Sequence, residues 1–117
     1  MRVWNILPEY LDVKRLVDEH CAVHGIWGAI KKNSPVQKHP QAIRFVNNLG
    51  ALRRRHEALV AEMALRGFKH HTPFPIEAVP EDQRNKPLHV SEELVERDIN
   101  ILRERWGREG NPFIVMI

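Results

Sequence analysis

The sequence predicts an all-α protein, a single compact domain over residues 1–117 with three main helices and long connecting loops. Three segments carry apolar residues at a spacing of three or four, the period of a helix with one buried face. Start or stop signals flank each segment. A chain of 117 residues can build one core of a few packed helices, and a second copy would help it bury surface.

The first helix is expected from about Val13 to Lys32, after an extended start. Asp12 is the candidate N-cap, since its side chain can accept a hydrogen bond from a first-turn backbone N–H. Gly25 and Gly28 would each cost an exposed helix about 1 kcal/mol relative to Ala. We therefore expect another backbone or a ligand to approach closely at both glycines. The apolar stripe of this helix is Val13, Leu16, Val17, Val23, Ile26, Trp27 and Ile30.

The second helix is expected from about Ala51 to Arg66, with Gly67 at the C′ position, where a left-handed backbone is common. Residues 41–47 are expected to form a helical turn that presents Arg44, and residues 47–50 to turn the chain. The apolar face of the helix is Leu52, Leu59, Val60, Met63 and Ala64.

The third helix is expected to start after the N-cap Ser91 and to end at about Arg105 or Trp106. The proline-rich stretch 70–87 before it should be an ordered loop that wraps the helices, because it carries regularly placed apolar residues, Phe74, Ile76 and Val79. The terminal residues 111–117 are strongly apolar, so we expect them to pack on the body or to pair two copies into a homodimer. The apolar stripe of the third helix is Val95, Ile99, Leu102 and Trp106.

The composition, 43% hydrophobic and 28% charged, is that of a soluble globular protein. No apolar run approaches the roughly 18 residues that span a bilayer, and Arg2, Asn5 and Glu9 interrupt the start, where a signal peptide would be apolar. A single cysteine excludes an internal disulfide framework and fits a reducing compartment. We expect a cytoplasmic protein that has no contact with membranes.

The net charge is only +3, but the cations cluster at Lys31-Lys32, at Arg53-Arg54-Arg55 and from Arg66 to Lys69. The arginine triplet stands at the start of the second helix, where the helix dipole disfavours cations and favours anions. A stabilising role for the triplet is therefore not evident from the sequence. The clusters indicate an anionic partner, although such clusters are also common on solvated helix faces.

Four stretches of this chain carry a resemblance to a known family. They are Met1-Arg2-Val3-Trp4-Asn5, Glu19-His20-Cys21-Ala22-Val23-His24-Gly25-Ile26-Trp27-Gly28-Ala29-Ile30, Lys38-His39-Pro40 through Arg44-Phe45, and Arg53-Arg54-Arg55-His56-Glu57 through Arg66-Gly67-Phe68. With them, over roughly residues 1–74, the chain resembles the pyrimidine-dimer DNA glycosylases, the endonuclease V type of large tailed phages and their microbial relatives.

The resemblance implies an active site in which the N-terminal α-amino group attacks the sugar C1′ of a damaged nucleotide and forms a Schiff base. A glutamate on the first helix supports that chemistry in the family, and its position falls on Ala22 here. The family's arginines at neighbouring positions fall on Cys21 and Gly25. Because a methyl group cannot transfer protons, and such transfer contributes about 10²–10⁴ in rate, we expect a degenerate active site.

If the chain is active, the resemblance leaves the α-amino group of Met1 as the nucleophile and Glu19 as the substitute acid. Glu19 lies three residues before Ala22 and so projects from nearly the same face of the helix. The alternative for Glu19 is a structural ion pair. We assign no other catalytic residue.

The candidate ligand-binding residues are of three kinds: arginines that could bind phosphate, a tryptophan that could stack on a base, and small residues that enlarge the pocket. A guanidinium can bond phosphate bidentately, a tryptophan can stack on a base, and small residues in place of Arg and Glu leave room. The full set is Arg2, Trp4, Asn5, His20, Cys21, Ala22, Gly25, Arg44, Arg53 and Arg55. Of the other tryptophans, Trp27 falls on the apolar stripe and is expected in the core.

His20 and His24 stand four residues apart, the spacing of two metal ligands on one helix, and His56 is available on the second helix. The chain has no His-Glu-x-x-His and no Cys-x-x-Cys motif. We therefore expect no metal and no cofactor, and a hydrogen-bonded or phosphate-facing role for the histidines, with zinc binding as the alternative. Cys21 is expected to be a small buried or half-buried thiol, not a nucleophile.

Two functions are compatible with these features. In the first, the chain is not an enzyme but binds a nucleotide-type ligand in the emptied pocket and sequesters a nucleotide signal. In the second, it is a DNA-repair glycosylase and abasic-site lyase that acts on pyrimidine dimers through the amine of Met1. The expected partner is accordingly a small nucleotide or DNA.

Overall fold

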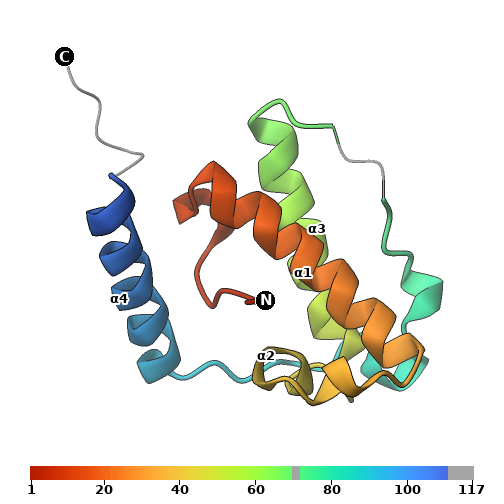
Figure 1. Ribbon diagram of the computed structural model, residues 1–117. Helices are drawn as coiled ribbons and strands as arrows, with labels where there is room; N and C mark the ends of the chain where they lie inside the picture. The colour runs from red at the N-terminus through yellow and green to blue at the C-terminus, as the bar shows by residue number, and fades with distance from the viewer. Residues whose placement is uncertain (70–71, 111–117) are drawn as a thin grey trace.

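The computed structural model describes residues 1–69 and 72–110, and these form helices and loops with no β-strand (Figure 1). Two long helices, α1 (Val13–Lys31) and α3 (Leu49–Leu65), are joined through the short α2 (Pro40–Ile43), and α4 (Glu92–Glu109) closes the described chain. Single 3₁₀ turns lie at Pro8–Tyr10 (η1), Pro35–Lys38 (η2), Ile76–Ala78 (η3) and Glu81–Gln83 (η4). The predicted all-α class with three main helices is confirmed.

The core lies where α1 packs against α3 (Figure 1). The predicted apolar face of α1 is largely confirmed, although its first member, Val13, is half exposed. Trp27 is partly buried and packs against the core, as expected. The fully buried side chains that face each other include Leu16, Val23 and Ile26 of α1 and Leu52 and Leu59 of α3.

Both long helices start at side-chain caps. Asp12 accepts a hydrogen bond from the backbone N–H of Arg15 at 3.3 Å, which confirms it as the N-cap of α1. Asn48 accepts from the backbone N–H of Ala51 at 3.1 Å and starts α3 two residues earlier than predicted. Asp and Asn suit the N-cap position because their side-chain oxygens accept hydrogen bonds from first-turn N–H groups that have no partner within the helix.

Gly50 belongs to the first turn of α3, and the prediction that it turns the chain is wrong. A Cβ atom on Gly50 would lie 1.9 Å from the backbone oxygen of Gln83, so the η4 turn packs directly on this glycine. Gly25 and Gly28, by contrast, have nothing within 4 Å of such a Cβ among the described residues. The expected close approach of another backbone at those two positions is therefore wrong.

The C-terminus of α3 confirms the role predicted for Gly67, which has φ of +86°. The backbone N–H of Gly67 donates to the oxygen of Ala64 at 3.0 Å, and that of Phe68 donates to the oxygen of Met63 at 2.9 Å. This double hydrogen-bond pattern is a Schellman motif, which satisfies the last carbonyls of the helix.

The loop after α3 wraps the α1–α3 pair as predicted. Phe74 and Val79 are buried and Ile76 is partly buried. The ring of Phe74 stacks on that of Trp27 with 4.3 Å between centroids. Residues 70–71 of this stretch lie outside the described chain.

Helix α4 begins at the N-cap Ser91, as expected, but runs to Glu109, three residues beyond the predicted end, and stops at Gly110 with φ of +91°. It stands at the edge of the molecule, and the N-terminal segment runs between it and the other two long helices (Figure 1). Polar contacts attach it to the start of α1: the Trp106 indole N–H donates to Asp12 at 2.9 Å.

The apolar residues 111–117, for which packing or dimer formation was expected, lie outside the described chain. Among the helices of residues 1–69 and 72–110, none has the length and apolar character needed to cross a membrane.

Candidate functional site

The N-terminal segment is fixed by a buried carboxylate of α4. Asp98 is 2% exposed and accepts a hydrogen bond from the Arg2 guanidinium at 2.8 Å. It also accepts from the backbone and side-chain nitrogens of Asn5, at 2.6 and 3.1 Å. Asp98 therefore sets the path of the segment that leads to the N-terminus.

Two of the predicted phosphate clamps, Arg44 and Arg55, hold the same segment from the other side. Arg44 donates to the Val3 carbonyl at 3.2 Å and to the side-chain oxygen of Asn5. Arg55 donates to the Ile6 carbonyl at 2.7 Å. Burial lowers the pKa of Arg44 below its usual range. These bonds use two N–H groups of Arg44 and three of Arg55, so both side chains hold the fold together, a role that the sequence did not predict.

Glu19 forms a buried ion pair with Arg55. The Nε and Nη2 atoms of Arg55 donate to the two carboxylate oxygens at 2.5 and 2.9 Å. The Glu19 side chain is 0% exposed, and its burial raises the pKa of the carboxyl above the usual range, while the bonds from Arg55 act in the opposite direction. The structural ion pair is thus the correct alternative for Glu19.

A pocket of about 700 Å³ opens beside the N-terminus, between α1 and α4. Its wall on α1 includes Lys14, Asp18 and Ala22, which lie four residues apart on one face of the helix. Cys21 and Gly25 extend this face and are both exposed, so the expected half-buried state of the thiol is wrong. The remaining lining residues are Met1, Arg2, Trp4, Arg15, Glu19, Arg105, Arg108 and Glu109.

Cations outnumber carboxylates in this pocket. Six cationic groups, counting the amine of Met1, and three carboxylates line it. Arg15 binds Glu109 through two hydrogen bonds, at 2.5 and 2.9 Å, and this contact lowers the pKa of Glu109 to about 2. Glu19 is paired with Arg55. Among the described residues, the third carboxylate of the pocket, Asp18, is exposed to solvent and has no described cationic partner.

Trp4 is a core residue. It is 3% exposed, and the guanidinium groups of Arg2 and Arg105 lie over its ring at 5.0 and 5.5 Å from the centroid. Although Trp4 lines the pocket, its ring offers little exposed surface on which a base could stack. Its function is to support two of the cations that line the pocket.

The predicted ligand-binding residues divide among three places. Arg2, Trp4, Cys21, Ala22 and Gly25 line the N-terminal pocket. A second cavity, of about 620 Å³ on the other side of the N-terminal segment, takes Asn5, Arg44 and Arg55. His20 and Arg53 belong to neither cavity.

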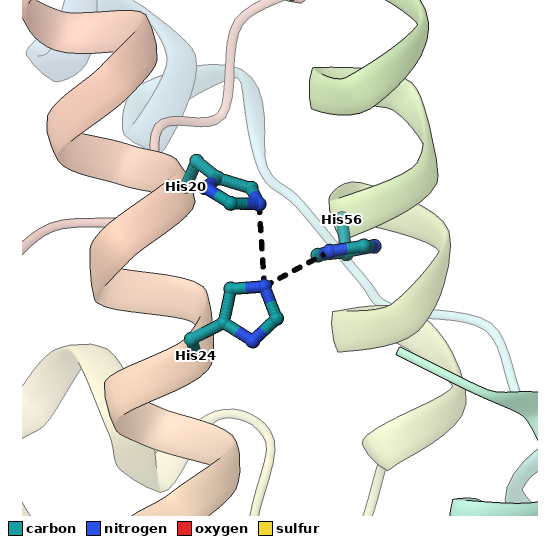
Figure 2. A group of neighbouring side chains, drawn as sticks. All are labelled: His20, His24 and His56. Atoms are coloured by element: carbon teal, nitrogen blue, oxygen red, sulfur yellow. Dashed lines mark hydrogen bonds between the residues drawn. The ribbon is translucent and has the colours of Figure 1, made fainter. Parts of the chain in front are cut away.

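His20 lies in a cluster with His24 and His56, in which the three rings point toward one another from α1 and α3 (Figure 2). The Nε2 atoms of His20 and His24 are 3.2 Å apart, and those of His24 and His56 are 3.1 Å apart. This face of α1 is directed toward α3, away from the pocket wall that carries Asp18 and Ala22. The expected hydrogen-bonded role is compatible with these distances, whereas the phosphate-facing role in the pocket is not.

The arginine triplet at the start of α3 has a structural explanation. Arg53 donates to the Phe74 carbonyl at 2.8 Å, and Arg54 donates to the Arg84 carbonyl at 2.9 Å. Together with the bonds of Arg55, these contacts attach the loop and the N-terminal segment to α3. The sequence did not make this stabilising role evident, because the acceptors lie far away along the chain.

Comparison with known families decides the relationship of this chain. A family model described as pyrimidine dimer DNA glycosylase matches residues 1–76. The chain belongs to this family. No curated protein and no solved structure matches it. The match covers the N-terminal segment, α1 and α3, while α4 lies beyond it.

Ala22 shares a pocket with the N-terminus. It lies on the wall of the pocket that Met1 also lines, and it is the residue at which we expected the family's catalytic glutamate. The rest of the pocket comes from outside the family match, because Arg105, Arg108 and Glu109 belong to α4.

Two pocket residues, Asp18 and Arg105, were not predicted from the sequence. Asp18 lies one helical turn before Ala22, and this i, i+4 spacing was the signal that could have identified it. No local signal identifies Arg105, since only the docking of α4 brings it to the pocket.

Proposed function

We propose that the N-terminal pocket binds an anionic, nucleotide-type ligand and that this family member does not turn the ligand over by the glycosylase route. The observation that carries the proposal is a cation-rich pocket around Ala22, at the position where the family's catalytic carboxylate is expected. A binder of this kind would sequester its ligand.

The charge and size of the pocket support this proposal. Lys14 and Arg108 are largely exposed at its rim, at 66% and 68% of their side chains, and Arg105 lies behind them over Trp4. A volume of about 700 Å³ is within the range of roughly 300–1,000 Å³ that is typical of small-molecule sites. Cations at a rim attract phosphate, and a guanidinium can hold it through two parallel hydrogen bonds.

The state of the glutamates that line the pocket supports the second half of the proposal. Ala22 cannot transfer a proton, and the carboxylates of Glu19 and Glu109 are held by Arg55 and Arg15. General acid–base catalysis typically contributes about 10²–10⁴ in rate.

One observation favours the second candidate, a DNA glycosylase and abasic-site lyase. Asp18 is exposed on the same pocket wall as Met1. The amine of Met1 would attack the sugar C1′ while the glycosidic bond breaks and its electron pair leaves with the base. Asp18 would replace the missing glutamate in the proton transfers that follow.

The binding proposal is tested by releasing any retained ligand from denatured protein for mass spectrometry, and by calorimetric titration with nucleotides. Arg105→Ala should weaken nucleotide binding by about 1.5–3 kcal/mol if its guanidinium makes a charge-assisted bond to phosphate. Arg97→Ala is the matched control, because Arg97 is exposed on the same helix and does not line the pocket. Equal binding by both variants and wild type would remove Arg105 from the site.

Salt dependence and covalent trapping separate the two candidates. Binding of a small nucleotide should depend weakly on salt, whereas duplex DNA loses affinity with a log–log slope of about −0.9 per phosphate contacted. With abasic-site DNA and borohydride we expect trapping and strand cleavage near background. Efficient cleavage that Asp18→Asn abolishes would establish the lyase instead, with intact mass confirming a free amine on Met1.

A further inference from the structure

Three histidines on two different helices bring one nitrogen each to a common point (Figure 2). His20 and His24 lie one turn apart on α1, and His56 lies on α3. Two of the Nε2 separations are 3.2 and 3.1 Å, and all three candidate ligand atoms lie within 4.8 Å of one another. None of the three side chains lines the N-terminal pocket.

We propose that His20, His24 and His56 bind a divalent transition-metal ion, with zinc as the expected ion, through their Nε2 atoms. Zinc–nitrogen bonds of about 2.0–2.1 Å in a tetrahedral site place two ligand nitrogens about 3.3 Å apart. The measured separations of 3.2 and 3.1 Å are close to this value. The third separation, between His20 and His56, is at most 4.8 Å, and binding would require these two rings to turn until their nitrogens reach the tetrahedral spacing.

The proton inventory of the rings favours a cation at the centre. Each imidazole nitrogen carries either one hydrogen or one lone pair in the plane of the ring. The Nε2 atom of His24 faces two other Nε2 atoms, at 3.2 and 3.1 Å, and a single hydrogen or lone pair cannot serve both contacts well. Three lone pairs directed at one metal ion remove this conflict.

Glu57 is placed to orient one of the three histidines. The Nδ1 atom of His56 lies 3.0 Å from Oε1 of Glu57. When Nδ1–H donates to this carboxylate, the lone pair of His56 is on Nε2, which faces the other two rings. Metal-binding histidines commonly have a carboxylate or carbonyl in this position, which fixes the tautomer and the ring orientation.

The surroundings select the class of metal. His56 is 1% exposed, and aromatic rings cover the cluster: Phe74 lies 5.7 Å from His56 and Trp27 lies 6.2 Å from His24 between ring centroids. Imidazole ligands suit zinc, copper and nickel, whereas magnesium and calcium prefer oxygen ligands. The part of the chain that the structure describes supplies three ligands, and a tetrahedral site takes a fourth from water or from another group.

A metal at this point would join the two helices that form the core. Its affinity for the folded chain adds directly to folding stability, because the three ligands are not assembled in the unfolded state. Pocket residues on α1 would be held in place by the same link, but the metal site does not depend on the proposed nucleotide binding.

The test uses the full chain without a histidine tag, freed of metal by dialysis against a chelator. Co²⁺ should produce the visible d–d absorption of a tetrahedral site, and Zn²⁺ should displace it. Zn²⁺ at a free concentration 100-fold above Kd should raise Tm by roughly 5–10 °C. Absence of both the Co²⁺ spectrum and the Zn²⁺-dependent Tm shift in wild-type protein would overturn the proposal.

Variants assign the site to the cluster. His24→Gln should abolish the Co²⁺ spectrum, and Glu57→Gln, at an exposed side chain, should weaken Zn²⁺ binding by about 10–100-fold while the protein remains folded. His89→Gln is the matched control, since His89 is exposed and lies outside the cluster. If His89→Gln weakens binding as much as Glu57→Gln does, or if Glu57→Gln binds as wild type does, the assignment is wrong.

Discussion

Substitution of Arg55 by Met is the sharpest test of how this fold is held together. The change removes both hydrogen bonds to the buried Glu19 carboxylate and the bond to the Ile6 carbonyl. Removing one partner of a buried ion pair typically costs about 3–5 kcal/mol, because an uncompensated charge stays in the interior. The side-chain exposures of 16% for Arg55 and 0% for Glu19 place this pair in that class.

Two effects limit the loss. Water can reach the space left by the partly exposed end of Arg55, and Glu19 can take up a proton instead of remaining charged. Burial already raises the pKa of Glu19, and the variant also lacks the arginine that opposes this shift. We therefore expect a loss of about 3–4 kcal/mol at pH 7, a large fraction of the roughly 5–15 kcal/mol that stabilises a typical domain.

The sign of the pH dependence follows from the direction of that shift. A carboxyl whose folded pKa lies above its unfolded value binds more protons in the folded state between the two values. In the folded Arg55→Met variant, the pKa of Glu19 lies above its unfolded value of about 4.3. The stability of the variant should thus increase as pH falls from the folded pKa toward the unfolded one. The destabilisation relative to wild type should be smaller at pH 5 than at pH 7.

Urea unfolding followed by circular dichroism at the two pH values measures both quantities. The double variant Glu19→Leu/Arg55→Met should recover most of the loss, because an apolar pair can replace a buried ion pair at little cost. Arg97→Met, at an exposed position, should change stability by no more than about 0.5 kcal/mol. A loss below about 1 kcal/mol for Arg55→Met, or a loss independent of pH, would refute this explanation of the core.

Three further outcomes are expected. Gly50→Ala should be strongly destabilising in urea unfolding because its Cβ would lie 1.9 Å from a backbone oxygen, whereas Gly107→Ala in open space should stabilise the protein by about 0.5–1 kcal/mol; a harmless Gly50→Ala would contradict the close packing of η4. The pKa of Glu109 is lowered to about 2 by Arg15, so this contact stabilises the fold above pH 4.5 and its contribution is lost as pH falls from 4.5 to 2; Glu109→Gln should flatten that part of a plot of urea midpoint against pH. Cys21, the single cysteine, is exposed on the pocket wall, so saturating nucleotide should slow its alkylation by iodoacetamide, and an unchanged rate would place the ligand elsewhere.

The sequence determined the helical architecture because its signals are local. The apolar period of α1, the N-caps Asp12 and Ser91 and the glycine stop at Gly67 are each encoded within a few residues, and all were confirmed. The start of α3 was predicted two residues too late, because the helix begins after the cap of Asn48. A distant contact explains the glycine in its first turn: Gly50 admits the backbone of Gln83, more than thirty residues away.

The family relationship was also available from the sequence, since its motifs lie in continuous stretches of residues 1–76. Only the tertiary structure, however, shows what the charged side chains bind within the protein. Arg44 donates to Val3 and Asn5, which lie 41 and 39 residues away. Arg55 donates to Ile6 and Glu19, which lie 49 and 36 residues away. In the sequence, an arginine that stabilises the fold looks the same as one that faces a ligand. Only the three-dimensional distance from its guanidinium to a buried carbonyl or carboxylate distinguishes the two.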